Sequence, residues 1–166
     1  MSVAVDIIVS APLWPDEQAL EALADKAVRA SVAASGARLA RNVELCISFS
    51  DDASIRELNA QWRKQDKPTN VLSFPTPGAL KTKPMLGDIV IAQETVAREA
   101  LEQDKTFLDH TTHMIVHGVL HLLGYDHEND ADAELMEALE RRIAASLGLG
   151  DPYEGTSPLQ HATQTD

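Results

Sequence analysis

The chain has 166 residues, 44% of them hydrophobic, and a net charge of −12 at neutral pH. This length and composition predict one soluble globular domain with a sizeable core. The negative charge, taken alone, argues against a nucleic-acid partner, because binding to a polyanion depends on Lys and Arg. The single cysteine, Cys46, excludes an intrachain disulfide and favours a reducing cytoplasm. The N-terminal apolar run is short and interrupted by Asp6, so we expect neither a signal peptide nor a membrane span.

The pattern of apolar residues along the chain predicts a small α+β domain. We expect strands at about 3–9, 43–49, 71–74 and 86–92 and helices at about 15–35, 51–63, 93–102, 107–123 and 130–147. The resulting fold is a single domain at residues 1–150, with a mixed sheet of about four strands packed with helices on one face or most of it. Residues 151–166 mix turn formers and polar residues without periodicity and predict a disordered tail.

The last predicted helix, residues 130–147, is amphipathic and acidic. The apolar side chains that we expect to face the core are Leu135, Met136, Leu139, Ile143 and Leu147. The acidic side chains are Asp130, Asp132, Glu134, Glu137 and Glu140. Because an acidic face repels RNA, we expect it to meet solvent or a basic protein.

A histidine-rich segment, HGVLHLLGYDH, has the spacing of metal ligands. His117 and His121 are four residues apart, so on a helix they share one face and can bind one ion. Gly124 can end the helix in a left-handed turn, after which His127 can return as a third ligand. Three protein ligands leave one tetrahedral position open, which is typical of catalytic zinc, although nickel, copper or iron could bind the same nitrogens. His113, one turn earlier, is a candidate catalytic residue that either supports a ligand or faces the substrate.

The same segment resembles the metzincin peptidase signature HExxHxxGxxH at every position but one. Gly118 replaces the glutamate, which is the general base of peptide hydrolysis. The metal ligands therefore remain, while the chemistry of a peptidase loses its central residue. Asp126, beside the third histidine, either orients a ligand or a water molecule or caps the turn.

Three motifs resemble, in the same order, the YbeY endoribonucleases, the bacterial family that matures and quality-checks ribosomal RNA. They are LNAQWRKQDKPTNVLSFP, LGDIVIA and HMIVHGVLHLLGYDH. The resemblance implies a zinc ion held by His117, His121 and His127 and a functional arginine at Arg63. The family usually has aspartate at the position of Asn70, where this chain departs from the pattern.

The resemblance also implies an activity and a set of partners. The activity is that of a zinc-dependent endoribonuclease specific for single strands, acting in rRNA processing, including maturation of the 16S rRNA 3′ end, and in ribosome quality control. The expected partners are an rRNA precursor and the ribosome or its small-subunit proteins. We expect a cytoplasmic protein with no membrane or DNA partner.

A basic segment at residues 53–87 runs against the overall charge. Six Lys or Arg and two acidic residues give this segment a net charge of +4 and leave −16 on the remainder. The side chains that we expect to bind substrate are Lys64, Lys67, Lys81 and Lys83, the last two in an exposed loop at residues 79–84. The guanidinium group of Arg63 can bind the charge that develops on a phosphodiester, beside a metal that polarises the phosphate or activates water.

Two other functions stay open at this point. One is a metal-dependent hydrolase of another substrate, including a peptidase whose base comes from elsewhere, and a chelator-sensitive digest of casein would support it. The other is a ribosome-binding factor with a structural zinc. Co-sedimentation with ribosomes at unchanged affinity after mutation of the metal ligands would favour that function.

Overall fold

Nine elements of secondary structure form the domain in the computed structural model, which describes residues 3–153. They are β1 (Ala4–Val9), α1 (Glu17–Ser35), β2 (Glu44–Ser50), α2 (Asp52–Arg63), β3 (Val71–Pro75), β4 (Met85–Ala92), α3 (Gln93–Glu102), α4 (Phe107–Leu122) and α5 (Asp130–Ser146). Each strand and helix expected from the sequence is present, with bounds that differ by two residues or fewer.

The sheet has the strand order β1-β2-β4-β3. β1, β2 and β4 are parallel, and β3 runs antiparallel to β4 at one edge. An edge suits Pro75, because proline has no N–H to donate to a neighbouring strand. Opposite it stands Gly87, where a Cβ atom would collide with the carbonyl oxygen of Phe74. The expected α+β fold with a mixed four-stranded sheet is thus confirmed.

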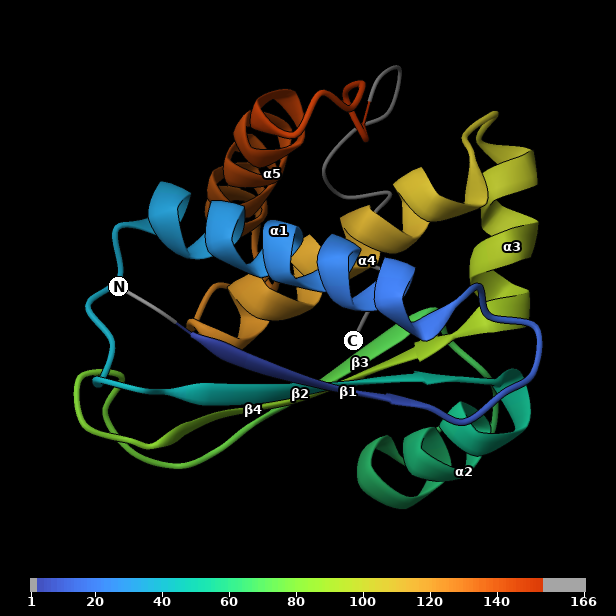
Figure 1. Ribbon diagram of the computed structural model, residues 1–166, viewed down its shortest axis with the longest axis horizontal. Coiled ribbons are helices and arrows are strands. Elements are labelled where there is room, and N and C mark those ends of the chain that lie inside the picture. The colour runs from blue at the N-terminus through green and yellow to red at the C-terminus, as the bar shows by residue number, and fades with distance from the viewer. Residues whose placement is uncertain (1–2, 154–166) are drawn as a thin grey trace.

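The helices lie in layers on the two faces of this sheet. Figure 1 shows α1 and α4 side by side over one face, with α5 packed above them, and α2 by itself on the opposite face. The expectation that helices cover one face is confirmed, and α2 adds cover to part of the other. None of the helices within residues 3–153 is long and apolar enough to cross a membrane.

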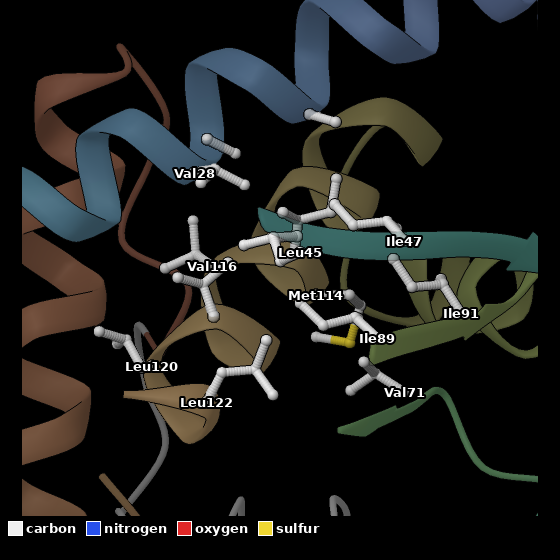
Figure 2. Close-up of a cluster of buried hydrophobic side chains, with 14 of the residues drawn as sticks. Val28, Leu45, Ile47, Val71, Ile89, Ile91, Met114, Val116, Leu120 and Leu122 are labelled. Atoms are coloured by element: carbon white, nitrogen blue, oxygen red, sulfur yellow. The ribbon is translucent and has the colours of Figure 1, made fainter. Parts of the chain in front are cut away.

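The main core lies between the sheet and the helices α1 and α4. Figure 2 shows Leu45 and Ile47 of β2 and Ile89 of β4 directed towards Val28 of α1 and Val116 of α4. Eleven of the sixteen residues of α4 are buried, so this helix is enclosed on most sides. The helix that carries the histidines is therefore also a central helix of the core, which gives its side chains a rigid base.

Two side chains are placed differently from the expectation. Lys83 is only 8% exposed, and its Nζ donates to the carbonyl of Thr76 at 2.7 Å, so the basic loop folds this lysine inward while Lys81 stays exposed. Leu135 of α5, expected in the core, is 55% exposed. The neighbouring Met136, which was also expected there, faces the core.

The segment after α5 folds back onto the domain at residues 151–153. Tyr153 is buried, and its backbone N–H donates to Oδ1 of Asp151, which also accepts from Nε of Arg141. The disordered tail expected at residues 151–166 stays a prediction, and its first three residues contact the domain in this way. The rest of that predicted tail, residues 154–166, lies outside the residues that the structure describes.

Candidate metal centre

The turn after α4 brings the three histidines of the motif together. α4 ends at Leu122, and Gly124 follows with a φ of 103°, a region that favours glycine. The N–H of Tyr125 then donates to the carbonyl of Leu120 at 3.0 Å, which closes the turn. Asp126 accepts from the backbone N–H of Glu128 at 3.0 Å, so of its two expected roles the structure shows the turn cap.

The imidazoles of His117, His121 and His127 form a group that could hold a metal ion. Their ligand atoms all lie within 4.8 Å of one another, and the Nε2 atoms of His117 and His121 are 3.1 Å apart. His117 is buried, and the other two are partly buried. Three converging imidazole nitrogens are a donor set that can hold a metal ion.

The surroundings of His121 and His127 favour the neutral form of these two imidazoles. Burial, together with the charges that His117 and His127 would carry, lowers the pKa of His121 to about 3. Burial and His117 likewise lower the pKa of His127. Because a metal binds the unprotonated nitrogen, these shifts keep His121 and His127 ready for a cation at neutral pH.

A buried carboxylate lies behind the first of these histidines. Glu140 of α5 is 1% exposed, and its Oε1 accepts from Nδ1 of His117 at 2.7 Å. The same oxygen lies 3.3 Å from Nε2 of His113, and Oε2 accepts from the hydroxyl of Tyr153 at 2.5 Å. Burial alone would raise the pKa of Glu140, but the charge of His117 and the hydrogen bonds from His113 and His117 outweigh it and hold the pKa well below its usual range.

The position of Glu140 differs from the expectation that the acidic face of α5 meets solvent. Glu137 and Glu140 are both buried, although the sequence suggested that they meet solvent or a basic protein. A signal for this was present: Glu140 is four residues after Met136 and three before Ile143, so it shares their inward face. An acidic residue at a core-facing helix position calls for hydrogen-bond partners.

His113 lies beside this carboxylate and outside the group of three imidazoles. Its Nε2 is 3.3 Å from the hydroxyl of Tyr153 and 3.3 Å from Oε1 of Glu140. Burial lowers the pKa of His113 to about 4, although Glu140 opposes this shift. This placement favours the supporting role over the substrate-facing one, and a catalytic role for His113 stays a prediction.

The glycine that replaces the peptidase glutamate faces the sheet. A Cβ atom on Gly118 would meet three atoms of the buried Ile89 at 3.0–3.2 Å, and the carbonyl of Gly118 accepts from the hydroxyl of Ser73 at 3.2 Å. A glutamate here would begin against β4. A side chain at this position would therefore crowd Ile89, and a peptidase built on this site would need its base from another residue.

A second buried polar cluster, which the sequence did not suggest, joins three elements. Asn70 precedes β3, and its Nδ2 donates to both carboxylate oxygens of Glu99 in α3, at 3.0 and 3.3 Å. Nε2 of His110 in α4 donates to Oε1 of Glu99 at 2.9 Å. This cluster ties the start of β3 to the two helices beside it.

Arg63 and the lysines of the basic segment stand on other elements than the three imidazoles, at the end of α2 and in the loops before β3 and β4. Arg63 ends α2, on the sheet face opposite α4 (Figure 1), and its Nε is buried without a hydrogen-bond partner among residues 3–153. The exposed lysines are Lys64, Lys67 and Lys81, whereas Lys83 is bound to Thr76 as described above. Arg56 pairs with Asp66 at 2.7 Å, which neutralises part of the segment.

Comparison with known proteins identifies relatives over nearly the whole chain. The family model described as Endoribonuclease YbeY matches residues 11–148. Endoribonuclease YbeY of Agrobacterium fabrum is 53% identical over 164 residues, which cover 93% of this chain and 97% of that protein. The protein of the same name from Methylocella silvestris is 52% identical over 154 residues, which cover 93% and 88%.

A solved structure shows the same fold. The solution structure of TM1509 from Thermotoga maritima has 26% sequence identity and a TM-score of 0.55, and the match covers 87% of this chain and 91% of that one. The residues that the family model matches include the histidine motif and every helix and strand except β1. The chain belongs to the Endoribonuclease YbeY family.

Proposed function

We propose that the protein is a zinc-dependent endoribonuclease that cleaves single-stranded RNA in the cytoplasm. Its proposed work is rRNA processing, including maturation of the 16S rRNA 3′ end, and ribosome quality control, with the ribosome or its small-subunit proteins as partners. Membership of the family supports the endoribonuclease role. The single observation that carries the proposal is the convergence of His117, His121 and His127 within 4.8 Å.

The donor set fits zinc. Three imidazole nitrogens would bind the ion through His117, His121 and His127, and burial lowers the pKa of His121 and His127, which favours the unprotonated form that binds metal. When bound, a zinc ion with an open position supplies Lewis-acid chemistry at a phosphodiester. The chain contributes the rigidity of the site, since two of the ligands stand on the enclosed helix α4.

Arg63 is the proposed contact to the phosphate. The side chain of Arg63 is partly exposed, and its Nε lacks a protein partner in the part of the chain that the structure describes, so its guanidinium group could bind an anionic oxygen. The exposed lysines 64, 67 and 81 would attract the RNA backbone through their charge. Lys83 would first have to leave the carbonyl of Thr76, and we therefore leave it out of the proposed surface.

Single-turnover cleavage of a structured RNA with single-stranded ends tests the proposal. We expect His117→Ala and Arg63→Glu to lower the cleavage rate at least about 100-fold, the usual order for loss of a transition-state contact. Arg142→Glu, which reverses the charge of an exposed arginine on α5, is the matched control and should retain the wild-type rate. Full activity of both site variants, with the fold checked by circular dichroism, would refute the site.

Metal content and salt dependence complete the test. Elemental analysis of the purified protein should find about one zinc ion per chain, lost from the His117→Ala variant. RNA affinity should fall as salt rises, and the slope should flatten when lysines 64, 67 and 81 are neutralised together. An unchanged slope would place the RNA on another surface. Ribosome co-sedimentation without any cleavage by the zinc-loaded protein would favour the binding factor instead.

A further inference from the structure

The carboxylate behind the three imidazoles is held from several sides. Glu140 accepts hydrogen bonds from His117 at 2.7 Å and from Tyr153 at 2.5 Å, and His113 lies 3.3 Å from it. A buried carboxylate is costly unless donors compensate it, so these contacts explain how α5 tolerates Glu140 on its apolar face. The donors come from α4 and from the segment after α5, which makes Glu140 the point where three parts of the chain meet.

The geometry divides the two ring nitrogens of His117 between two tasks. Nε2 faces the group of three imidazoles, 3.1 Å from Nε2 of His121. Nδ1 faces Glu140 at 2.7 Å. A carboxylate acceptor requires the proton on Nδ1, which leaves the lone pair of neutral His117 on Nε2. The lone pair then points to the place where a metal would bind.

The C-terminal segment fixes the carboxylate in its turn. Tyr153 is buried, and its ring lies 5.7 Å from the guanidinium carbon of Arg141. Burial and the charge of Glu140 raise the pKa of the Tyr153 hydroxyl well above its usual value, so this group stays a donor. Since a single hydroxyl bonds one oxygen of Glu140 and His117 bonds the other, rotation of the carboxylate is blocked.

We propose that Glu140 is a positioning residue that holds His117 in its metal-binding tautomer and orientation, and that Tyr153 locks Glu140 in place. This inference rests on the proposed metal site. It adds that the affinity of the site depends on α5 and on the segment that follows it, neither of which carries a ligand. Loss of a partner of this kind weakens metal binding about 10–100-fold in metalloproteins.

Zinc titration of the full metal-free chain against a chromophoric chelator, at pH 8, tests the proposal. Glu140→Leu removes the acceptor, and we expect zinc to bind about 10–100-fold more weakly. Glu140→Gln keeps an acceptor oxygen but removes the charge, and its zinc affinity should lie between those of the wild type and of Glu140→Leu. Tyr153→Phe removes one hydroxyl and should weaken binding about 3–10-fold, because Glu140 remains but is less fixed.

Glu137 provides the matched control. It stands on the same helix, is 4% exposed, and its Oε1 has no hydrogen-bond partner among residues 3–153. Glu137→Leu and Glu137→Gln remove a negative charge from the same helix without touching His117, so zinc affinity should stay within about threefold of wild type. A weakening equal to that of the Glu140 variants would mean that charge alone matters and would overturn the positioning role.

Thermal unfolding of the metal-free proteins separates positioning from folding. A merely structural Glu140 would lower the unfolding temperature and leave the zinc dissociation constant of the folded protein unchanged, which would overturn the proposal. If Glu140→Leu does not fold, Glu140→Gln and Tyr153→Phe decide, and affinity within about threefold of wild type in both would overturn it. A wild-type chain that binds no zinc would instead refute the proposed metal site, and this inference with it.

Discussion

Asn70→Asp tests the buried cluster that ties β3 to α3 and α4. Nδ2 of Asn70 donates to both oxygens of Glu99, and its Oδ1 accepts from the N–H of Val71 at 2.7 Å. The substitution exchanges only the NH2 group for an oxygen. It therefore keeps the contact with Val71, but it replaces the hydrogen bond to Glu99 with a contact between two carboxylates at about 3 Å.

The size of the effect follows from these contacts. A hydrogen bond to a charged group contributes about 1.5–3 kcal/mol, and the variant loses it. The two carboxylates can avoid further repulsion by sharing a proton, which costs about 1.4 kcal/mol per pH unit above a carboxyl pKa near 4, or about 4 kcal/mol at pH 7. We therefore expect Asn70→Asp to lower the free energy of unfolding by about 2–4 kcal/mol at pH 7.

The loss should depend on pH. In the wild type, burial tends to raise the pKa of Glu99, but the hydrogen bonds from His110 and Asn70 outweigh it and lower the pKa. In the variant, the carboxyl pair takes up a proton in the folded state, so its folded pKa lies above the unfolded value. The penalty is then absent below the unfolded pKa and grows as pH rises towards the folded pKa.

Urea unfolding at pH 5, 6, 7 and 8, followed by tryptophan fluorescence, measures this loss. Asn70→Ala is the control, since it removes the same contacts without adding a charge, and its stability difference from wild type should be nearly constant over this range. An Asn70→Asp variant within about 0.5 kcal/mol of wild type at pH 7, or one whose loss is equal at pH 5 and pH 8, would refute the reasoning.

Three further substitutions and one control test the packing and the buried charge. Gly118→Ala should lower the free energy of unfolding in urea by about 1–2 kcal/mol, because overpacking against Ile89 at 3.0–3.2 Å outweighs the helix propensity gained, and a stabilised variant would contradict this. Glu137→Gln should stabilise the protein by about 1–2 kcal/mol at pH 8 and by less at pH 5. The reason is that burial raises the pKa of Glu137 to about 7, so the wild type loses stability as pH rises from about 4.5 through this value. Equal thermal midpoints of variant and wild type at both pH values would count against this prediction. Trp14→Phe should lower the free energy of unfolding by about 1–2 kcal/mol, because it removes the hydrogen bond from the buried Nε1 to the carbonyl of Ser50 at 2.8 Å. Trp62→Phe, at a 63% exposed position, should change the free energy of unfolding by less than about 0.5 kcal/mol. Equal urea midpoints of the two variants would refute this difference.

Local patterns predicted most of the fold because its elements follow local rules. β2 alternates, with Leu45, Ile47 and Phe49 buried, and α2 begins where Asp51 accepts from the N–H of Ser54. The histidine turn was also predictable, since the spacing and Gly124 are features of one short segment. Such rules do not predict which residues far apart in the chain come into contact.

The partners of the site show why. Glu140 contacts His117, 23 residues earlier, and Tyr153, 13 residues later. Helical periodicity relates only residues of the same helix, so it does not predict either contact. Charge alone placed Glu140 in solvent, whereas its helical position next to Met136 and Ile143 placed it inside. Lys83 is a similar case, because the fold of its loop, and not its composition, directs its ammonium group to Thr76.

The position of the Glu140 carboxylate also bears on the kind of chemistry that the site can perform. A peptidase of the metzincin type needs its glutamate next to the metal, and here that position is Gly118, whose missing side chain would begin against Ile89. Glu140 cannot replace it, because it binds Nδ1 of His117, and the nitrogen that faces the other imidazoles is Nε2. The carboxylate of Glu140 therefore contacts the ring nitrogen of His117 that faces away from the other two imidazoles, where it can orient this imidazole.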